Sequence, residues 1–444
     1  LGRFRRRAVT LAAMHRMAAA DAVSYWMSQR IPNDEFLVYC FAVPRSSIED
    51  CAARLRLRAA HVDDLCLRIR DVPGTADRPY WESVRPADDQ VRVDASSRTW
   101  SSCLTEIAGL IAQPLDPTRE AWRAHLFGPV AEVPAATGPV VVVVLQVCHA
   151  LGDGRRMSRI ARDWFTAPAP PRRPVSEVRS PNHEMLLDAG TVLGGVLRFP
   201  GEFVATAWRG VRAARLASAS VPGTAGYAPT RLNVPPGPRR TLRVLVVARD
   251  QLSGPGVPVT VAVLTAISVA LPEYLGDRDR RYGAELTVGR GGERRARNHF
   301  RNAGIDLHID IDDLGERARL IGAEIAAARA AEADPLRAAQ RRASESTPAI
   351  LTRWGIRSFD LDTPPATVTG VTVVSSVNRG AADLDLDGGE ILFTTGFPAL
   401  SPAQGLTHGV HGIGDRVAIS VTTSPDVMND VDRYVELLAR ALGG

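Results

Sequence analysis

Apolar and β-branched residues gather in short runs along this chain of 444 residues, and amphipathic stretches alternate with them. The longest run, 140–147, is almost entirely valine and predicts a buried strand, and a helical pattern follows over 157–165. The same reasoning predicts strands over 35–44, 65–72, 80–93, 241–247, 285–290, 305–308, 368–374, 391–396 and 416–421. Helices are predicted over 47–57, 102–113, 185–217, 257–271, 314–342 (one helix or two) and 427–442. We therefore expect an α/β protein.

The pattern divides the chain into two large parts joined by a connecting region. Residues 1–13 are rich in arginine, with too short an apolar run for a signal peptide, and we expect a disordered extension. Residues 14–165 form the first predicted lobe and residues 241–444 the second. Residues 166–240 contain two Pro/Gly-rich connectors around the helix predicted over 185–217.

The helix predicted over 185–217 is amphipathic and basic. Its charges interrupt the apolar residues too often for a membrane span. A basic amphipathic helix can lie on a membrane surface, or it can pack on the body of the protein. The sequence leaves both interpretations open.

The composition narrows the chemistry. The formal charge is +5, and all 54 basic residues are arginine, so chemistry that needs a lysine amine is excluded. Arginine suits phosphate groups, such as those of a CoA nucleotide or an anionic membrane. A mild excess of positive charge spread along the chain does not indicate a nucleic-acid-binding protein.

Cysteine and histidine give no metal or disulfide pattern. The five cysteines lie within the first 150 residues, and their odd number and spacing favour reduced thiols in a cytoplasmic protein. No metal-ligand cluster stands out among the nine histidines. His408 and His411 lie close together, but the glycines around them favour a surface turn, so we predict no metal site.

The residues after the valine run carry the candidate chemistry. Val147-Cys-His149-Ala-Leu-Gly-Asp153-Gly154 places a histidine where a buried strand ends. Its unperturbed pKa near neutrality suits a general base, although a lone histidine in such a turn is more often a buried side chain whose hydrogen bond a carbonyl accepts. Asp153 is expected to form a turn or helix N-cap, and Gly154 a turn conformation that a Cβ would disfavour.

The spelling His-x-x-x-Asp-Gly after an apolar strand resembles the signature of the CoA-dependent acyltransferase superfamily. Within it, the order of segments resembles the wax ester synthase/diacylglycerol acyltransferase family. A small-residue-Asp-Ala-aromatic segment begins near Asp21, Leu-Asp-Pro ends at Pro117, and a later strand ends in Arg290. The resemblance runs in family order from about Met17 to Leu442.

This resemblance implies two chloramphenicol-acetyltransferase-like lobes with a central tunnel and His149 at its middle. His149 would be the general base, with no covalent acyl-enzyme, no metal and no cofactor, since acyl-CoA is a substrate. Asp153 and Gly154 would shape the active-site loop. We expect Arg290 to be the arginine that pairs with Asp153. Hydroxyl candidates for an oxyanion or acceptor site lie in the second lobe, at Ser375, Ser376 and Thr407.

Departures from the family pattern leave the substrates open. Cys148 replaces a first histidine, Thr260-Val261 stands where an Asn-Asp pair is usual, and Ser376 replaces an asparagine. We expect an O-acyltransferase that moves a fatty acyl group from acyl-CoA to a lipid-like hydroxyl, in the cytoplasm and with possible peripheral membrane contact. The alternatives are a condensation-type enzyme of specialised metabolism, with a CoA or carrier-protein donor, and a non-catalytic lipid-binding homologue.

Cys148 itself could be imagined as a nucleophile beside His149. Adjacent residues of a strand point to opposite faces, however, so the two side chains should not touch. We therefore expect Cys148 to be a small buried residue.

Overall fold

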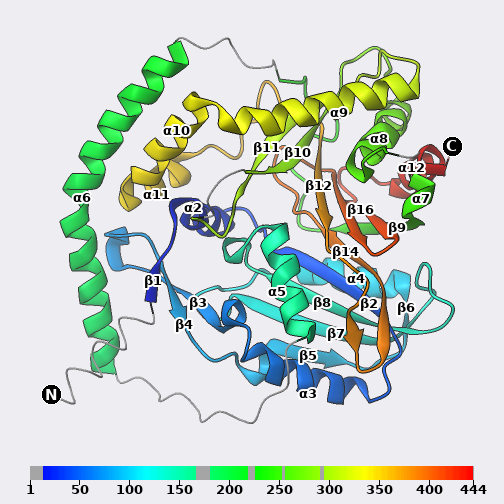
Figure 1. The fold of residues 1–444 in the computed structure, drawn as a ribbon, viewed down its shortest axis with the longest axis horizontal. Coiled ribbons are helices and arrows are strands. Elements are labelled where there is room, and N and C mark those ends of the chain that lie inside the picture. Colours follow the sequence, from blue (N-terminus) through cyan, green and yellow to red (C-terminus); the bar gives the residue numbers. More distant parts are fainter. Residues whose placement is uncertain (1–13, 167–180, 219–225, 253–255, 291–294, 444) are drawn as a thin grey trace.

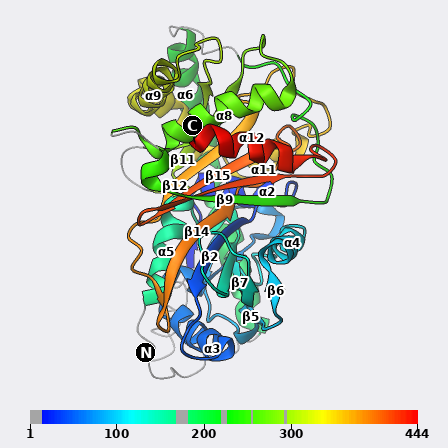
Figure 2. The same cartoon turned by 90° about the vertical axis from the view of Figure 1, so that its right-hand side faces the viewer.

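The protein folds into two lobes, each built on a β-sheet with helices packed on it (Figures 1 and 2). The computed structural model describes residues 14–166, 181–218, 226–252, 256–290 and 295–443. The α/β class expected from the sequence is confirmed, and Figure 2 shows one lobe above the other. The predicted extension, residues 1–13, lies outside the described residues.

The N-terminal lobe contains a seven-stranded sheet in the order β13-β14-β2-β8-β7-β5, with β6 paired to β7. Its strands are β2 (Glu35–Ala42), β5 (Val91–Asp94), β6 (Arg98–Thr99), β7 (Trp122–Ala131), β8 (Val140–Val147), β13 (Asp385–Leu386) and β14 (Gly389–Phe397). The hairpin of β13 and β14 comes from the C-terminal half of the chain, and β14 pairs with β2. The predicted lobe 241–444 therefore contributes two strands to the sheet of the other lobe.

Strand β8 is covered on both faces, which explains its unbroken valine run. The helices of this lobe are α3 (Ile48–Ala59), α4 (Trp100–Ile111) and α5 (Gly154–Thr166). Val141 belongs to the hydrophobic cluster that includes residues of α3 and α5, whereas Val142 belongs to the cluster that includes α4. A strand buried on both faces needs no polar alternation.

The C-terminal lobe contains a six-stranded sheet in the order β11-β10-β12-β15-β16-β9. Its elements are β9 (Thr241–Ala248), β10 (Gly283–Gly289), β11 (Phe300–Asp306), β12 (Thr372–Asn378), β15 (Thr407–Ile413), β16 (Arg416–Thr423), and the helices α8 (Val259–Leu275), α9 (Leu314–Ala330) and α12 (Val431–Gly443). Leu242 of β9 and Ala418 of β16 belong to the same hydrophobic cluster as Val142 of β8. The two sheets therefore share a packed interface.

Smaller elements surround the two sheets. They are a three-stranded sheet of β1 (Met14–Arg16), β4 (Tyr80–Ser83) and β3 (Leu67–Arg70), the helices α2 (Ala19–Ser28), α6 (Pro181–Ser218), α7 (Arg249–Leu252), α10 (Pro335–Ser346) and α11 (Ala349–Ser358), and the 3-10 turns η1 (Asp63–Cys66), η2 (Pro73–Thr75), η3 (Asp88–Gln90), η4 (His149–Leu151) and η5 (Ala331–Ala333). Figure 1 shows α6 along the outer edge of the molecule, beside α10. Within the described residues, none of the helices combines the length and apolar character needed to cross a bilayer.

The prediction that His408 and His411 lie in a surface turn is wrong. Both side chains are buried in β15, a strand that the sequence analysis missed. The misleading signal was glycine. A Cβ added at Gly409 would lie 2.6 Å from the carbonyl oxygen of Gly396, so glycine is present here because β14 approaches closely.

Three other predicted elements have different bounds. The strand predicted over 80–93 is two strands, β4 and β5, in different sheets, and the strand predicted over 368–374 lies further on, as β12. Of the one or two helices predicted over 314–342, the structure has two, because α9 ends at Ala330 and Pro335 begins α10. Proline suits the first turn of a helix and disfavours its interior, which explains the break.

Gly154 occupies a tight contact between the lobes. Its backbone φ is not in the left-handed region, so the turn conformation predicted for it is wrong. The requirement is space, because a Cβ at Gly154 would lie 2.7 Å from Cγ2 of Val377 in β12. Glycine therefore lets the beginning of α5 lie directly against the C-terminal sheet.

We predict that Gly154→Ala destabilises the protein by about 1–3 kcal/mol, because valine is stiff and the added methyl group overpacks the contact. Thermal and urea unfolding measure the effect. The control is Gly109→Ala at an exposed position of α4, where nothing lies within 4 Å of the added Cβ and alanine should stabilise the helix by up to about 1 kcal/mol. Equal stability of the two variants would contradict the contact.

Candidate active site

A cavity of about 750 Å³ is lined by residues of both lobes. The N-terminal lobe contributes the beginning of β2 and the turn that contains His149, Asp153 and Gly154. The C-terminal lobe contributes β10, β12, the beginning of α8 and the loop after β14. A space of this size is in the range of small-molecule sites.

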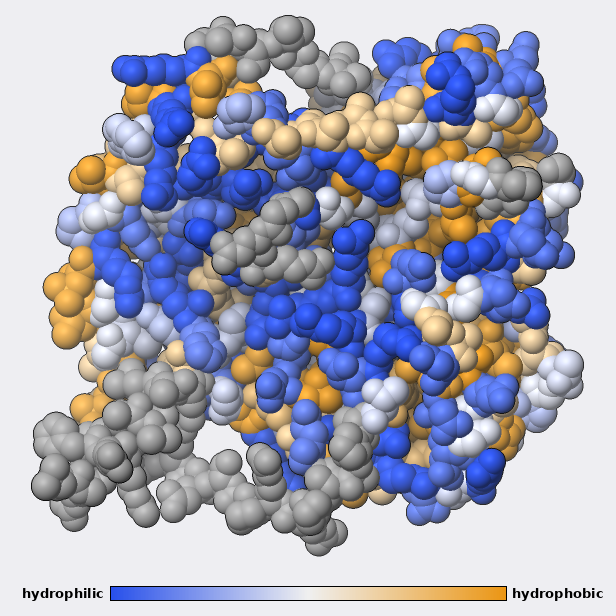
Figure 3. Space-filling model, in the orientation of Figure 1, coloured by the Kyte–Doolittle hydropathy of each residue, from blue (hydrophilic) through white to orange (hydrophobic). Residues whose placement is uncertain are grey.

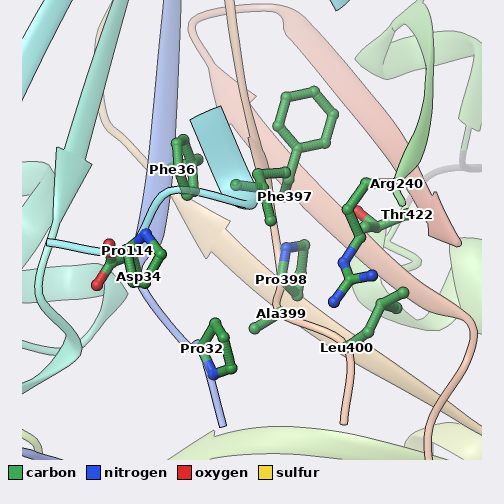
Figure 4. Close-up of a pocket in the computed structure, with 11 residues that line it drawn as sticks. Pro32, Asp34, Phe36, Pro114, Arg240, Phe397, Pro398, Ala399, Leu400 and Thr422 are labelled. Carbon is green, nitrogen blue, oxygen red and sulfur yellow. The ribbon is translucent and has the colours of Figure 1, made fainter. Parts of the chain in front are cut away.

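A small hollow of about 10 Å³ adjoins this cavity, with Asp34, Phe36 and the segment 397–400 lining both (Figure 4). It has room for about one water molecule. Figure 4 shows the guanidinium end of Arg240 pointing toward Pro398 and Leu400. This hollow is a recess beside the main cavity, and only the larger space can hold a substrate.

His149 lies at the wall of the main cavity, in the turn directly after β8. Its side chain is 22% exposed, and its ring stacks on Phe300 with centroids 5.7 Å apart. Asn298 donates a hydrogen bond of 2.7 Å from Nδ2 to the carbonyl oxygen of His149. The C-terminal half therefore contacts both the ring and the backbone of this histidine.

Glu35 is the acidic partner of His149. Nδ1 of His149 lies 2.9 Å from Oε1 of Glu35, an ion-pair distance whose geometry is not that of a well-aligned hydrogen bond. Strand pairing explains the contact, because Glu35 is opposite Val147, two residues before the histidine. A carboxylate here favours a proton on Nδ1, which leaves Nε2 as the ring nitrogen that can accept another.

The electrostatic environment keeps His149 close to the range of a base. Burial lowers the pKa of His149, but the negative charge of Glu35 and hydrogen bonds outweigh it, and the pKa is raised overall. His125, by contrast, is buried in β7 and does not line the cavity, and burial lowers its pKa to about 4. The two histidines thus differ in their access to the cavity and in the direction in which their pKa values are shifted.

Asp153 caps α5 and joins it to the other half of the chain. One carboxylate oxygen accepts the backbone N–H of Arg156 at 2.9 Å, which is the expected N-cap interaction. The other oxygen accepts the backbone N–H of His299 at 3.1 Å. The predicted N-cap is therefore present, with an additional partner from the C-terminal half.

Arg290 is not the partner of Asp153. Among the residues that the structure describes, no ion pair joins the two side chains, and the backbone N–H groups of Arg156 and His299 are partners of the Asp153 carboxylate. Arg290 instead lines the cavity at the end of β10, and burial lowers its pKa. The structure therefore does not contain the expected pair of Arg290 and Asp153.

Asp21 fixes the segment that contacts His149. Its buried carboxylate accepts the backbone N–H groups of Arg297 at 3.0 Å and of Asn298 at 2.8 Å. Burial raises the pKa of Asp21, against the opposing effect of these hydrogen bonds. Asp21 thereby positions Asn298, which holds the backbone of His149.

The three hydroxyl candidates are not equivalent. Ser375 and Ser376 of β12 line the cavity, and Oγ of Ser376 is 2.7 Å from Oγ1 of Thr260 on α8. Thr407 is fully buried and donates its hydroxyl to the carbonyl oxygen of Pro398, outside the cavity wall. Thr407 is therefore removed from the oxyanion candidates, because its proton is already committed.

The structure supports no other nucleophile or metal site near His149. Cys148 is buried in the hydrophobic core rather than in the cavity wall, and burial raises the pKa of its thiol to about 12. Among the described residues, no three His, Cys, Asp or Glu side chains gather as metal ligands would. His149 and His411 are the histidines that line the cavity; burial lowers the pKa of His411 well below its usual range, whereas the pKa of His149 is raised.

Sequence reasoning missed three residues of this site, namely Glu35, Asp21 and Asn298. Glu35 reaches His149 through the register of two strands that are far apart in the sequence. Asp21 and Asn298 are separated by 277 positions and meet through side-chain-to-backbone hydrogen bonds. The available signal was the Asp-Ala-aromatic segment that contains Asp21, which gave no indication of its partner.

We predict that Glu35→Gln lowers the pKa of His149, because the variant removes the negative charge beside Nδ1 and leaves the effect of burial. An NMR titration of the histidine ring measures it. The matched control is Glu324→Gln, which removes a carboxylate 2.9 Å from Nε2 of His308, away from the cavity. An unchanged titration of His149 in Glu35→Gln would contradict the pairing.

Known proteins resemble this chain in one domain and in its overall fold. Residues 297–444 match the WS/DGAT C-terminal domain family. A search of curated protein sequences finds no match. Among solved structures, the wax ester synthase/diacylglycerol acyltransferase from Marinobacter aquaeolei VT8 aligns with a TM-score of 0.61 at 15% identity, over 96% of this chain and 98% of that chain.

Two further structures share the architecture. The trichothecene 15-O-acetyltransferase TRI3 from Fusarium sporotrichioides aligns with a TM-score of 0.57 at 12% identity, over 97% of this chain and 95% of that chain. The starter condensation domain of rhizomide synthetase, solved with C8-CoA and Leu-SNAC, aligns with a TM-score of 0.54 at 15% identity, over 98% and 94%. The protein therefore has the two-lobed fold of these proteins, and residues 297–444 match the WS/DGAT C-terminal domain family.

Proposed function

We propose that the protein transfers a fatty acyl group from acyl-CoA to the hydroxyl of a lipid-like acceptor, such as a long-chain alcohol or a diacylglycerol, with His149 as the general base. The observation that carries this proposal is the position of His149 at the wall of a cavity shared by both lobes, with Glu35 beside Nδ1. That arrangement supports proton transfer at Nε2, inside a space that can hold two substrates together.

The proposed reaction needs one base and no covalent enzyme intermediate. Nε2 of His149 removes the proton of the acceptor hydroxyl while its oxygen attacks the thioester carbonyl. The tetrahedral intermediate then collapses, the carbon–sulfur bond breaks, and the proton on His149 passes to the CoA thiolate. The carboxylate of Glu35 stabilises the histidine while it carries this additional proton.

An oxyanion donor is required for the tetrahedral intermediate. Ser375 and Ser376 are the remaining hydroxyl candidates, because both line the cavity. Oγ of Ser376 also contacts Oγ1 of Thr260, and the Ser376 proton is available to an oxyanion when Thr260 is the donor in this contact. Thr260 belongs to the segment where related proteins have an Asn-Asp pair, so the contact links two departures from the family pattern.

The cavity lining supports both substrates. Arg155 lies close to Gly289 at the end of β10, and Arg290 follows directly, so guanidinium groups are available there for the phosphates of CoA. Arg329 also lines the cavity, near the end of α9. Much of the remaining lining is apolar and suits acyl chains, with Met27, Ile31, Phe36, Leu37, Leu286, Val288, Phe300, Phe397 and Leu400.

A condensation-type reaction is the second candidate, with an acyl donor on a carrier protein. It is favoured by the likeness to the rhizomide synthetase condensation domain, which extends over 98% of this chain. The two candidates share the base and differ in the donor. A third candidate is a non-catalytic lipid-binding protein. Lipid binding alone does not require a carboxylate beside a histidine at the cavity wall, so the contact between Glu35 and His149 does not favour it.

We predict that His149→Ala lowers acyl transfer about 10²- to 10⁴-fold, the usual contribution of a general base, while acyl-CoA binding is retained. Release of CoA is measured with a panel of acyl-CoAs, in the presence of a long-chain alcohol, a diacylglycerol or no acceptor. Isothermal calorimetry measures acyl-CoA binding separately.

The control is His308→Ala, because His308 is also 22% exposed and paired with a carboxylate but does not line the cavity. It should leave turnover nearly unchanged. Full activity of His149→Ala would disprove the assignment of the base. Binding of acyl-CoA without release for any acceptor would instead favour a carrier-protein donor or a non-catalytic role.

A further inference from the structure

Helix α6 presents its polar face to the body of the protein. Asp188 pairs with Arg70 at 2.8 Å, Arg198 with Asp77 at 2.7 Å, and Glu202 with Arg16 at 2.6 Å. Gly195 lies on the same face, where a Cβ would be 2.1 Å from the carbonyl oxygen of Ala76.

Between these positions the spacing is close to whole turns of the helix, so they form one continuous stripe. Ion pairs and a close backbone contact therefore attach α6 to the protein.

The opposite face of α6 is apolar and points to solvent. Leu197 is 72% exposed and Trp208 is 65% exposed, values unusual for side chains of this size. The exposed apolar residues recur at helical spacing and form a second stripe, with Met185, Leu186, Leu193, Val196, Leu197, Phe203, Val204, Trp208 and Val211. Figure 3 shows hydrophobic surface along the left-hand edge, where α6 runs in Figure 1.

An amphipathic helix normally buries its apolar stripe in the protein core. In α6 the orientation is the reverse, so the apolar stripe is exposed and available to bind a partner. A contiguous exposed patch of this kind marks a surface for binding.

The charges on α6 indicate what covers the stripe. Among the side chains that the structure describes on this helix, the acidic ones are Asp188 and Glu202, and both face the body in ion pairs. Arg212 and Arg215 are exposed, whereas Arg198 is paired with Asp77 on the face toward the body. Among the described side chains of α6, the outer surface thus combines apolar residues with the positive charge of Arg212 and Arg215, while Asp188, 42% exposed, is paired with Arg70 on the other face.

We propose that this face of α6 binds the surface of an anionic phospholipid bilayer, with the helix parallel to the membrane plane. The apolar stripe would enter the boundary between headgroups and acyl chains, while the arginines contact lipid phosphates. A second copy of the chain fits less well, because a symmetric contact would bring the arginines of both copies together. The proposal is independent of the reaction assigned to the cavity.

Helix α11 extends the apolar surface on this side of the molecule. Like α6, it contacts the turn η2; its Trp354 is exposed, and so is Phe359, which directly follows it. Tryptophan and phenylalanine are typical of protein surfaces that enter the interfacial region of a membrane.

Co-sedimentation with vesicles tests the proposal on the full-length protein. Vesicles are made of phosphatidylcholine alone or of an equimolar mixture with phosphatidylglycerol. The wild type should bind the anionic vesicles, and added salt should weaken the binding. The double variant Leu197→Asp/Trp208→Asp should lower the partition coefficient at least about tenfold, because it removes two of the inserted side chains.

The control is Val43→Asp/Val234→Asp, which changes two exposed valines outside α6 and should retain binding. Arg212→Glu should weaken binding to the anionic vesicles and leave binding to phosphatidylcholine unchanged.

Failure of the wild type to bind either vesicle, or equal binding by the Leu197/Trp208 variant, would overturn the proposal. Dimerisation in solution that this variant abolishes, without vesicle binding, would assign the face to a second copy instead. CoA release with soluble short-chain substrates should be the same in the variant and the wild type, so failure here is distinguishable from failure of the proposed reaction.

Discussion

The geometry of the site depends on how residues 297–299 attach to the N-terminal half of the chain. Asp21 accepts two backbone N–H groups of this segment and Asp153 accepts a third. Asn298, fixed in this way, donates to the carbonyl oxygen of His149. Buried carboxylates are costly unless donors surround them, so each aspartate strongly favours the arrangement in which the segment is in place. These four hydrogen bonds thus fix the position of residues 297–299 against the turn that contains His149.

Contacts from both lobes also determine the charge environment and orientation of His149. Strand pairing brings Glu35 beside Nδ1, and the ring of Phe300 limits how His149 can turn. The cavity wall opposite is made by β10 and β12 of the C-terminal lobe. Neither lobe alone has a base, an orienting carboxylate and the hydroxyl groups of Ser375 and Ser376. A reaction that needs all of these is possible only where the lobes meet.

What the sequence predicts well is local. The apolar run over 140–147 and the turn after it follow from residue type and spacing, and so does the N-cap at Asp153. What it misses depends on pairing between distant segments. The contact of Glu35 with His149 depends on the register with which β2 pairs with β8. The burial of Thr407 depends on strand β15, whose glycines led us to predict a turn. Gly154 was singled out correctly, but its reason is the proximity of β12, which no local pattern reveals.

The central claim is that neutral His149 accepts a proton during acyl transfer, and the pH dependence of kcat/KM tests it most directly. The profile reports the pKa of the essential base in the free enzyme, and NMR reports the pKa of His149 in the same protein. Because Glu35 raises that pKa, the rate should fall as the pH drops through a value above the usual one for histidine. Coincidence of the two values, with a shift of both to lower pH in Glu35→Gln, is the expected result. A rate that stays constant while His149 titrates would contradict the account.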